Sequence, residues 1–251
     1  MAKKVRTPPP RPRQQGPRRR DSKPPRGQFR PLGLNKRGLL TGMGAGAAIG
    51  VVIVVLLLTS GTKHNVTPTV SSSRARTALA AAGCTLREVR PLPPKDGKNY
   101  HDDSPSLTSD VKWSTFPPSG GGHYPAWAVW GFYREAVNPR QVVHNLEHGA
   151  VVIWWGPQVP STTVDKLEQF YNESPDGMFG TPIAGLGKKI ALTAWTGDPH
   201  KYYRNGYYGI GRIAVCTHFD QTAFAAFRGA FRGQGPEGIP LSVDKPGMGP
   251  G

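Results

Sequence analysis

The sequence predicts an α+β fold: a single compact extracytoplasmic domain with a mixed or antiparallel sheet and a few helices, placed after one N-terminal transmembrane helix. Three observations support this prediction. A long uncharged apolar stretch precedes the domain. Short β-branched and aromatic runs then alternate irregularly with capped helical segments, which is typical of α+β domains rather than of repeated βαβ units. Of the 23 aromatic residues, 22 lie between Tyr100 and Phe231, which places one core there.

The first 37 residues form a basic, proline-rich segment. They carry 13 Lys and Arg against a single acid, Asp21, and so contribute +12 of the formal net charge of +16. With eight prolines and only Phe29 as an aromatic, residues 1–37 bury too little apolar surface to fold and are predicted to be a disordered cytoplasmic tail. We expect this tail to contact anionic lipid headgroups. Nucleic acid is not an expected partner, because no recognisable nucleic-acid module accompanies the charge.

Residues 38–58 are predicted to be a transmembrane signal anchor. Leu39 to Leu58 are 20 positions without a charge, which as a helix with a rise of about 1.5 Å per residue span about 30 Å, the thickness of a bilayer core. The positive charges before them place the N-terminus in the cytoplasm and the domain outside the cell membrane. Gly42, Gly46 and Gly50 form a stripe of small residues. This stripe either supports a homodimer in the lipid bilayer or reflects the frequency of glycine in membrane helices.

The rest of the chain divides into a polar, flexible stalk at residues 59–73, the folded domain at residues 74–245 and a flexible C-terminus at residues 246–251. Within the domain, end signals and apolar patterns predict the elements. The expected strands are residues 84–89, 127–133, 150–155, 189–195 and 212–218. The outer helices are Arg74–Ala82 ended by Gly83, a helix to about Glu173 capped by Thr162 and Asp165, and a helix capped by Asp220, ended by Gly233 and carrying Phe224, Phe227 and Phe231 on one face.

One further helix organises the prediction of function. Asn138 is a good N-cap, Pro139 suits the first helical position, and Gly149 suits a left-handed C-cap. Between these signals, His144 and His148 are four residues apart and therefore lie on one helix face. We expect this face to point away from the core, which the apolar residues of the opposite side reach.

Two imidazoles at this spacing can bind one metal ion. We expect His144 and His148 to be the principal ligands, with His123 and His101 completing the set. His123 follows three glycines, which suit a sharp turn that lays His123 over the helix face and equally suit a plain flexible loop. Imidazole ligands in this compartment favour copper or zinc. Expected to orient the ligands from a second layer are the acidic residues Glu147, Asp103 and Glu237.

Two other readings of this helix stay open. The string His144-Asn-Leu-Glu147-His148 also matches the inverted zinc-protease motif, in which Glu147 would be the general base on a metal-bound water. That motif requires a glutamate ligand further along the chain, and residues 220–231 contain none. In the structural reading, the histidines are neutral, buried and hydrogen-bonded, and the domain is a structural or interaction module. No catalytic residue is assigned unless the protein is a hydrolase.

The chain contains two cysteines, Cys84 and Cys216. In an extracytoplasmic domain the simplest expectation is that they form one disulfide. Alternatively, Cys216 and His218 are soft ligands for copper.

The run Val143-His-Asn-Leu-Glu-His-Gly-Ala-Val-Val-Ile153 resembles the signature of a bacterial family of membrane-anchored proteins with domain of unknown function 3105. The resemblance covers residues 74–244 and implies a shared fold and a shared histidine-rich site, without a particular activity. Further matching segments are Ala82-Gly-Cys84, His101, Pro117-Pro-Ser-Gly-Gly-Gly-His123, Gly131-Phe-Tyr133, Thr193-Ala-Trp195 and Gln234-Gly-Pro-Glu237. The expected protein is a single-pass membrane protein with an extracytoplasmic transition-metal site.

Overall fold

A computed structural model describes residues 67–97, 99–201 and 208–250 of the chain. The predicted tail, the predicted membrane anchor and most of the predicted stalk lie outside these residues. Among the described helices, none combines the length and the apolar character needed to cross a membrane.

The described domain is built on one mixed five-stranded sheet with the order β1-β5-β4-β2-β3. Neighbouring strands are antiparallel except β2 and β3, which are parallel and are connected through a helix. This arrangement confirms the predicted α+β class. The strands are β1 (Thr85–Val89), β2 (Val151–Trp155), β3 (Met178–Pro182), β4 (Ile190–Thr196) and β5 (Ile210–Cys216).

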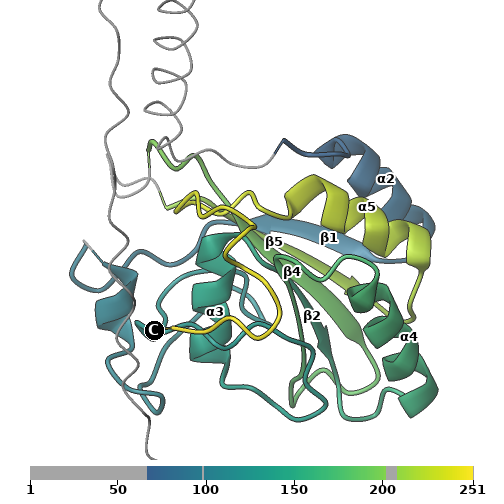
Figure 1. The fold of residues 1–251 in the computed structure, drawn as a ribbon, viewed down its shortest axis with the longest axis horizontal. Coiled ribbons are helices and arrows are strands. Elements are labelled where there is room, and N and C mark those ends of the chain that lie inside the picture. Colours follow the sequence, from purple (N-terminus) through teal and green to yellow (C-terminus); the bar gives the residue numbers. More distant parts are fainter. Residues whose placement is uncertain (1–66, 98, 202–207, 251) are drawn as a thin grey trace, which may run out of the picture. The chain divides into compact units, whose positions relative to one another are not determined.

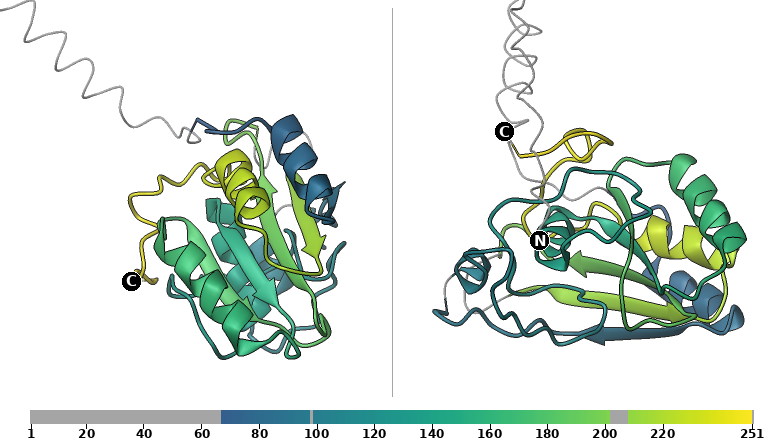
Figure 2. Two further views of the ribbon diagram at one scale, coloured as in Figure 1. Left: turned by 90° about the vertical axis from the view of Figure 1, so that its right-hand side faces the viewer. Right: turned by 90° about the horizontal axis from the view of Figure 1, so that it is seen from below.

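The helices cover the two faces of the sheet unequally (Figures 1 and 2). One face carries α2 (Ser72–Ala81), α4 (Ser161–Asn172) and α5 (Gln221–Phe231). The other face carries α3 (Pro139–His148), together with the loops that include the short 3₁₀ helix η1 (Tyr100–Asp103). The chain after α5 returns across the end of α3 (Figure 1).

Strand β2 lies between β4 and β3 and is buried along its whole length. Because side chains alternate along a strand, Val151, Ile153 and Trp155 pack towards the three-helix face, whereas Val152 and Trp154 pack towards α3. The predicted phenylalanines of α5 lie in the first of these cores.

The disulfide between Cys84 and Cys216 is confirmed, with an S–S distance of 2.02 Å. Since β1 and β5 are antiparallel and Thr85 lies opposite Val215, the two cysteines face each other where the strand pair ends. The copper alternative for Cys216 and His218 is therefore wrong: the sulfur is already bonded, and the His218 side chain is exposed.

The predicted strand Trp127–Tyr133 is wrong. This run is a loop that makes a single bridge to the sheet, between Phe132 and Gly180. Its backbone groups bond elsewhere; Trp130, for example, donates its N–H to the carbonyl of Met248 at 2.9 Å. Of the aromatic residues that suggested a strand, Trp130 is fully buried, and the others pack against the cores while remaining partly exposed.

Several element boundaries also differ from the predictions. Helix α2 begins at Ser72, two residues earlier than expected, because the Ser71 side chain caps it. Thr162 and Asp165 do not cap α4, whose N-cap is Pro160 without a side-chain hydrogen bond. Asp165 pairs with Arg134 instead, at 2.8 Å. Strand β5 begins at Ile210 and ends at Cys216, and β3 was not predicted.

Candidate metal centre

Helix α3 has the predicted ends. The Asn138 side chain accepts the N–H of Arg140 at 3.0 Å, and Pro139 occupies the first turn. Gly149 closes the helix in the left-handed region with φ 114°, and a Cβ there would lie 2.9 Å from the backbone nitrogen of Gly235. Glycine at both positions therefore allows the chain after α5 to pack tightly against the end of α3.

The expectation that the histidine face of α3 points outward is wrong. Glu147 is fully buried, and His144 and His148 expose only 4% and 6% of their surface. Loops from both sides of α3 in the sequence cover this face, and they bring further ionisable side chains to it. The helix face that was expected to be solvated is therefore a buried polar layer covered by loops.

Four side chains converge in this layer and are called the inner cluster: His101, His123, His144 and Glu147. One donor atom from each lies within 4.8 Å of the others. His101 Nε2 is 3.2 Å from Glu147 Oε2, and His123 Nε2 is 3.0 Å from the same oxygen. The residues come from η1, from the glycine loop and from α3, so the fold assembles the cluster from three distant segments.

Two of these rings are fixed by backbone carbonyls. His123 Nδ1 lies 2.7 Å from the carbonyl of Gly121, and His144 Nδ1 lies 2.9 Å from that of Tyr124. Because a carbonyl oxygen can only accept, each Nδ1 must carry the proton and donate it. The neutral rings then direct the lone pair of Nε2 into the cluster, as in histidines that ligate metals.

The three glycines before His123 place it against α3. Gly120 and Gly121 have φ values of 146° and 111°, and a Cβ at Gly120 would meet the Trp195 ring at 2.8 Å. A Cβ at Gly122 would lie 2.6 Å from that of Asp103. Only glycine permits this approach, which matches the interpretation as a closely packed loop and not the alternative of a plain flexible loop.

Asp103 is not among the potential metal ligands. Its carboxylate accepts the backbone N–H of Lys95 at 2.9 Å, and its Cβ packs against Gly122. Asp103 therefore supports the loop of His123 rather than bonding to a ring.

His148 lies next to the inner cluster in a second group, called the outer trio: His144, His148 and Glu237. His148 Nε2 is 3.5 Å from Glu237 Oε2, and Nδ1 is 3.3 Å from Asp244 Oδ1. Sequence reasoning missed Asp244, a buried acid in a glycine- and proline-rich segment without a recognisable motif.

Burial and proximity shift the ionisation of this layer. The hydrogen bond to Glu147 raises the pKa of His101 above its ordinary value. Burial alone would raise the pKa of Glu147, but the neighbouring imidazoles, first His123 and then His101, hold it well below its ordinary value. Burial, followed by the neighbouring His123, lowers the pKa of His144 to about 3. Near neutral pH, Glu147 is thus a buried carboxylate and His144 an uncharged base.

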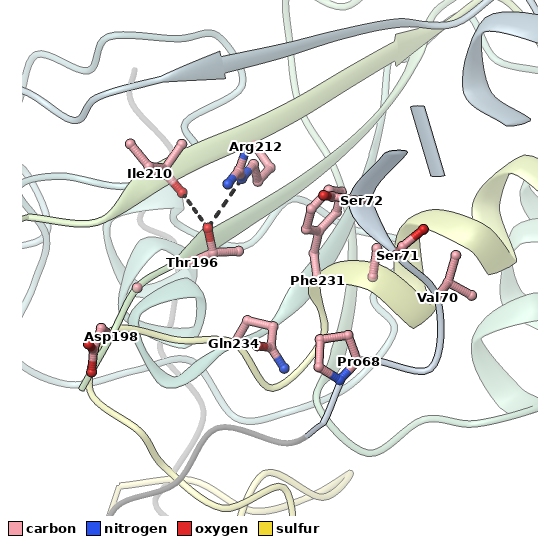
Figure 3. A pocket seen from close by; sticks show the side chains of 12 residues that line it. Pro68, Val70, Ser71, Ser72, Thr196, Asp198, Ile210, Arg212, Phe231 and Gln234 are labelled. Carbon is pink, nitrogen blue, oxygen red and sulfur yellow. Dashed lines mark hydrogen bonds between the residues drawn. The ribbon is translucent and has the colours of Figure 1, made fainter. Parts of the chain in front are cut away.

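A cavity of about 450 Å³ opens beside the two groups. Its wall is mostly apolar, and the ring of Trp127 lies 4.8 Å from that of His148 and 5.4 Å from that of His144. The residues that line it are His101, Pro125, Trp127, His144, His148, Glu237, Ile239, Val243, Asp244, Met248 and Gly249. A second cavity of about 530 Å³, between the start of α2 and the ends of β4 and α5, contains no histidine (Figure 3).

Fold and site together define an α+β domain with a buried imidazole–carboxylate centre under a loop cover. The family model for proteins of unknown function, DUF3105, matches residues 106–240, which is more than half of the chain. The chain belongs to this family. Comparisons with curated proteins and with solved structures found no match.

Proposed function

We propose that this domain binds one transition-metal ion through the inner cluster, with His101, His123 and His144 as nitrogen ligands and Glu147 as an oxygen ligand. In this proposal Glu147 is a ligand, whereas the sequence had suggested a role in orienting the rings. The four donor atoms lie within 4.8 Å of one another. Donors of a tetrahedral zinc site are about 3.3 Å apart, so small side-chain adjustments close the site around an ion.

The observation that carries the proposal is the contact between His123 and Glu147. His123 Nε2 is completely buried and lies 3.0 Å from Glu147 Oε2, yet it makes no hydrogen bond of acceptable geometry. The Nδ1–H group of His123 already donates to the carbonyl of Gly121. A lone pair and a carboxylate oxygen so close together repel each other unless a positive charge lies between them. Either a proton or a metal ion supplies that charge, and the two further imidazoles favour a metal.

Imidazole and carboxylate donors suit zinc and copper. With Glu147 ionised, a divalent ion leaves the site with one positive charge and a monovalent copper ion leaves it neutral. Both charge states are acceptable in a buried site whose ligands replace the hydration of the ion.

Asparagine variants provide the sharpest test. His123→Asn and His144→Asn can keep the hydrogen bond to the backbone carbonyl while removing Nε2. Full-length protein without a histidine tag is offered Cu²⁺ or Zn²⁺, dialysed and analysed for metal. We expect one ion per wild-type chain and a loss of affinity of at least ~10-fold in each variant. The matched control is His218→Asn, which removes an exposed histidine outside the cluster.

The result that contradicts the proposal is a wild-type protein that remains metal-free with both ions. If the asparagine variants then melt at lower temperature than the wild type, the histidines are structural core residues.

The hydrolase reading is the weaker one. Glu147 contacts two rings and does not line the cavity through which a substrate would approach. If the domain were a hydrolase, the Glu147→Gln variant would keep its metal ion and lose turnover. A ligand role predicts that the same substitution weakens metal binding.

The membrane anchor stays part of the proposal, supported by the uncharged stretch at residues 38–58 and by the charge step before it. Protease added to intact cells should then remove the domain and leave the basic tail protected. Protection of the domain would contradict this topology.

A further inference from the structure

We propose that the outer trio is the entry and exit position for the metal ion, and that His144 passes the ion between this position and the inner cluster. This inference rests on the proposed metal binding and adds a route to it. It assigns a role to His148 and Glu237, which the inner cluster does not use.

The cavity wall gives the direction of the route. His101, His144, His148 and Glu237 line the cavity, whereas His123 and Glu147 do not. The side chains of Glu237 and His101 are each 29% exposed, and those of His123 and Glu147 are at most 1% exposed. An ion that arrives through the cavity therefore meets the outer trio before it reaches the innermost ligands.

His144 connects the two positions. Its ring centroid is 4.9 Å from that of His123 and 5.0 Å from that of His148. Because Nδ1 donates to the Tyr124 carbonyl, only Nε2 can bind a metal. One nitrogen atom cannot hold two ions, so occupation of one position excludes full occupation of the other. The two groups thus form two alternative binding positions for a single ion rather than a dinuclear site.

Contacts to His148 and to the backbone of Glu237 position the outer trio. Asp244 contacts Nδ1 of His148, so the Nε2 atom of His148 points towards Glu237; this carboxylate–histidine arrangement orients many metal ligands. The backbone N–H of Glu237 bonds to the carbonyl of Glu147 at 3.4 Å. Gly233 bonds to Gly149 at 2.8 Å in the same way. These ties fix the segment that carries Glu237 to the end of α3.

The chemistry of the cavity explains why the route needs these side chains. Much of its wall is apolar and offers no replacement for the water molecules around an ion. Glu237 is the most exposed carboxylate of the two groups and supplies the opposite charge at the entrance. Its removal should therefore raise the barrier for entry and, by microscopic reversibility, the barrier for exit.

The test measures loading and removal rates in the full-length protein. Cu²⁺ is mixed with the apoprotein and followed by quenching of tryptophan fluorescence, for which Trp127 beside His144 and His148 is a built-in reporter. Removal is followed after addition of excess chelator, and both measurements are repeated with Zn²⁺ and a metal indicator. The variants are Glu237→Gln and His148→Asn, which can keep the Asp244 contact. The control is Glu135→Gln, the same charge change at an exposed position outside both groups.

We expect both rates to fall about 10-fold in Glu237→Gln and in His148→Asn, by the same factor, so that the dissociation constant changes much less than either rate. Glu135→Gln should match the wild type, and every protein should bind one ion. Unchanged rates in both variants would overturn the route while leaving metal binding intact. Two ions per chain, or a loss of affinity with unchanged loading rate, would overturn it as well. A wild type that binds neither ion refutes the proposed function itself.

Discussion

The two faces of the sheet are covered in opposite ways. On the face of α2, α4 and α5, the buried side chains are almost entirely apolar, and the disulfide joins the two strands at its edge. On the face of α3, the buried apolar cluster is smaller and lies beside a buried layer of histidines and carboxylates. Both faces share β2, whose alternating side chains belong to one core or the other.

This difference indicates that the two faces of the sheet have different roles. Buried apolar area and the crosslink stabilise the fold, whereas desolvated ionisable groups reduce its stability unless they are paired. A polar layer of this kind persists because the three-helix face stabilises the domain. Changes on that face should therefore alter stability, and changes on the α3 face should alter metal binding.

The largest effect is expected from removal of the disulfide. The crosslink joins residues 132 positions apart, and on the chain-entropy model a loop of this length stabilises the folded state by about 4–5 kcal/mol. The double variant Cys84→Ser with Cys216→Ser should lose about this free energy of unfolding in denaturant titrations. Its folded fraction should bind metal as the wild type does; a lost site with unchanged stability would reverse the proposed division.

A smaller effect is expected from pH in the metal-free protein. The pKa of His144 is lowered to about 3 in the folded state, whereas an unfolded histidine binds its proton near 6.5. As the pH falls below 6.5 the unfolded state takes up this proton first, so stability decreases by up to about 1.4 kcal/mol per pH unit. The pKa of His101 is raised above 6.5 in the folded state. This group therefore adds stability that is lost as the pH rises above 6.5, and it does not offset the loss at lower pH.

His144→Asn should therefore flatten the loss of stability between about pH 6 and about pH 4. Chemical denaturation of the two metal-free proteins at several pH values measures this difference. Parallel curves for the wild type and the variant would show that His144 is protonated in the folded protein, contrary to the buried geometry.

An effect on stability similar to that of pH or smaller is expected at the glycine loop. A Cβ at position 122 would lie 2.6 Å from that of Asp103, so Gly122→Ala should move the loop and cost about 1–3 kcal/mol. Because the loop carries His123, metal affinity should fall as well. Gly97→Ala is a control for a positive-φ glycine without close neighbours; it should lower stability without affecting the metal. Equal affinity in both variants would mean that the loop does not position His123.

Local signals predicted the elements of the fold where the structure depends on local contacts. The caps Asn138, Gly149 and Asp220 act as expected, because the capping hydrogen bond is made within the helix itself. The loop at Trp127–Tyr133 and strand β3 were missed, because distant partners decide their conformation.

The candidate site was only partly predictable for the same reason. The spacing of His144 and His148 places them on one helix face, and the glycines before His123 are compatible with a close approach. Sequence spacing cannot show that loops bury this face, that Glu147 lies among the rings, or that Asp244 contacts His148 from 96 positions away. These features arise when the loops close over α3.

The most direct test of the metal site is X-ray absorption spectroscopy of the full-length protein, without a histidine tag, loaded with one equivalent of Zn²⁺. We predict a first shell of three imidazole nitrogens and one carboxylate oxygen at about 2.0–2.2 Å, and the loss of one imidazole in His123→Asn. A shell with fewer than two imidazoles in the wild type, or a spectrum that His123→Asn leaves unchanged, would contradict the inner cluster as the metal site.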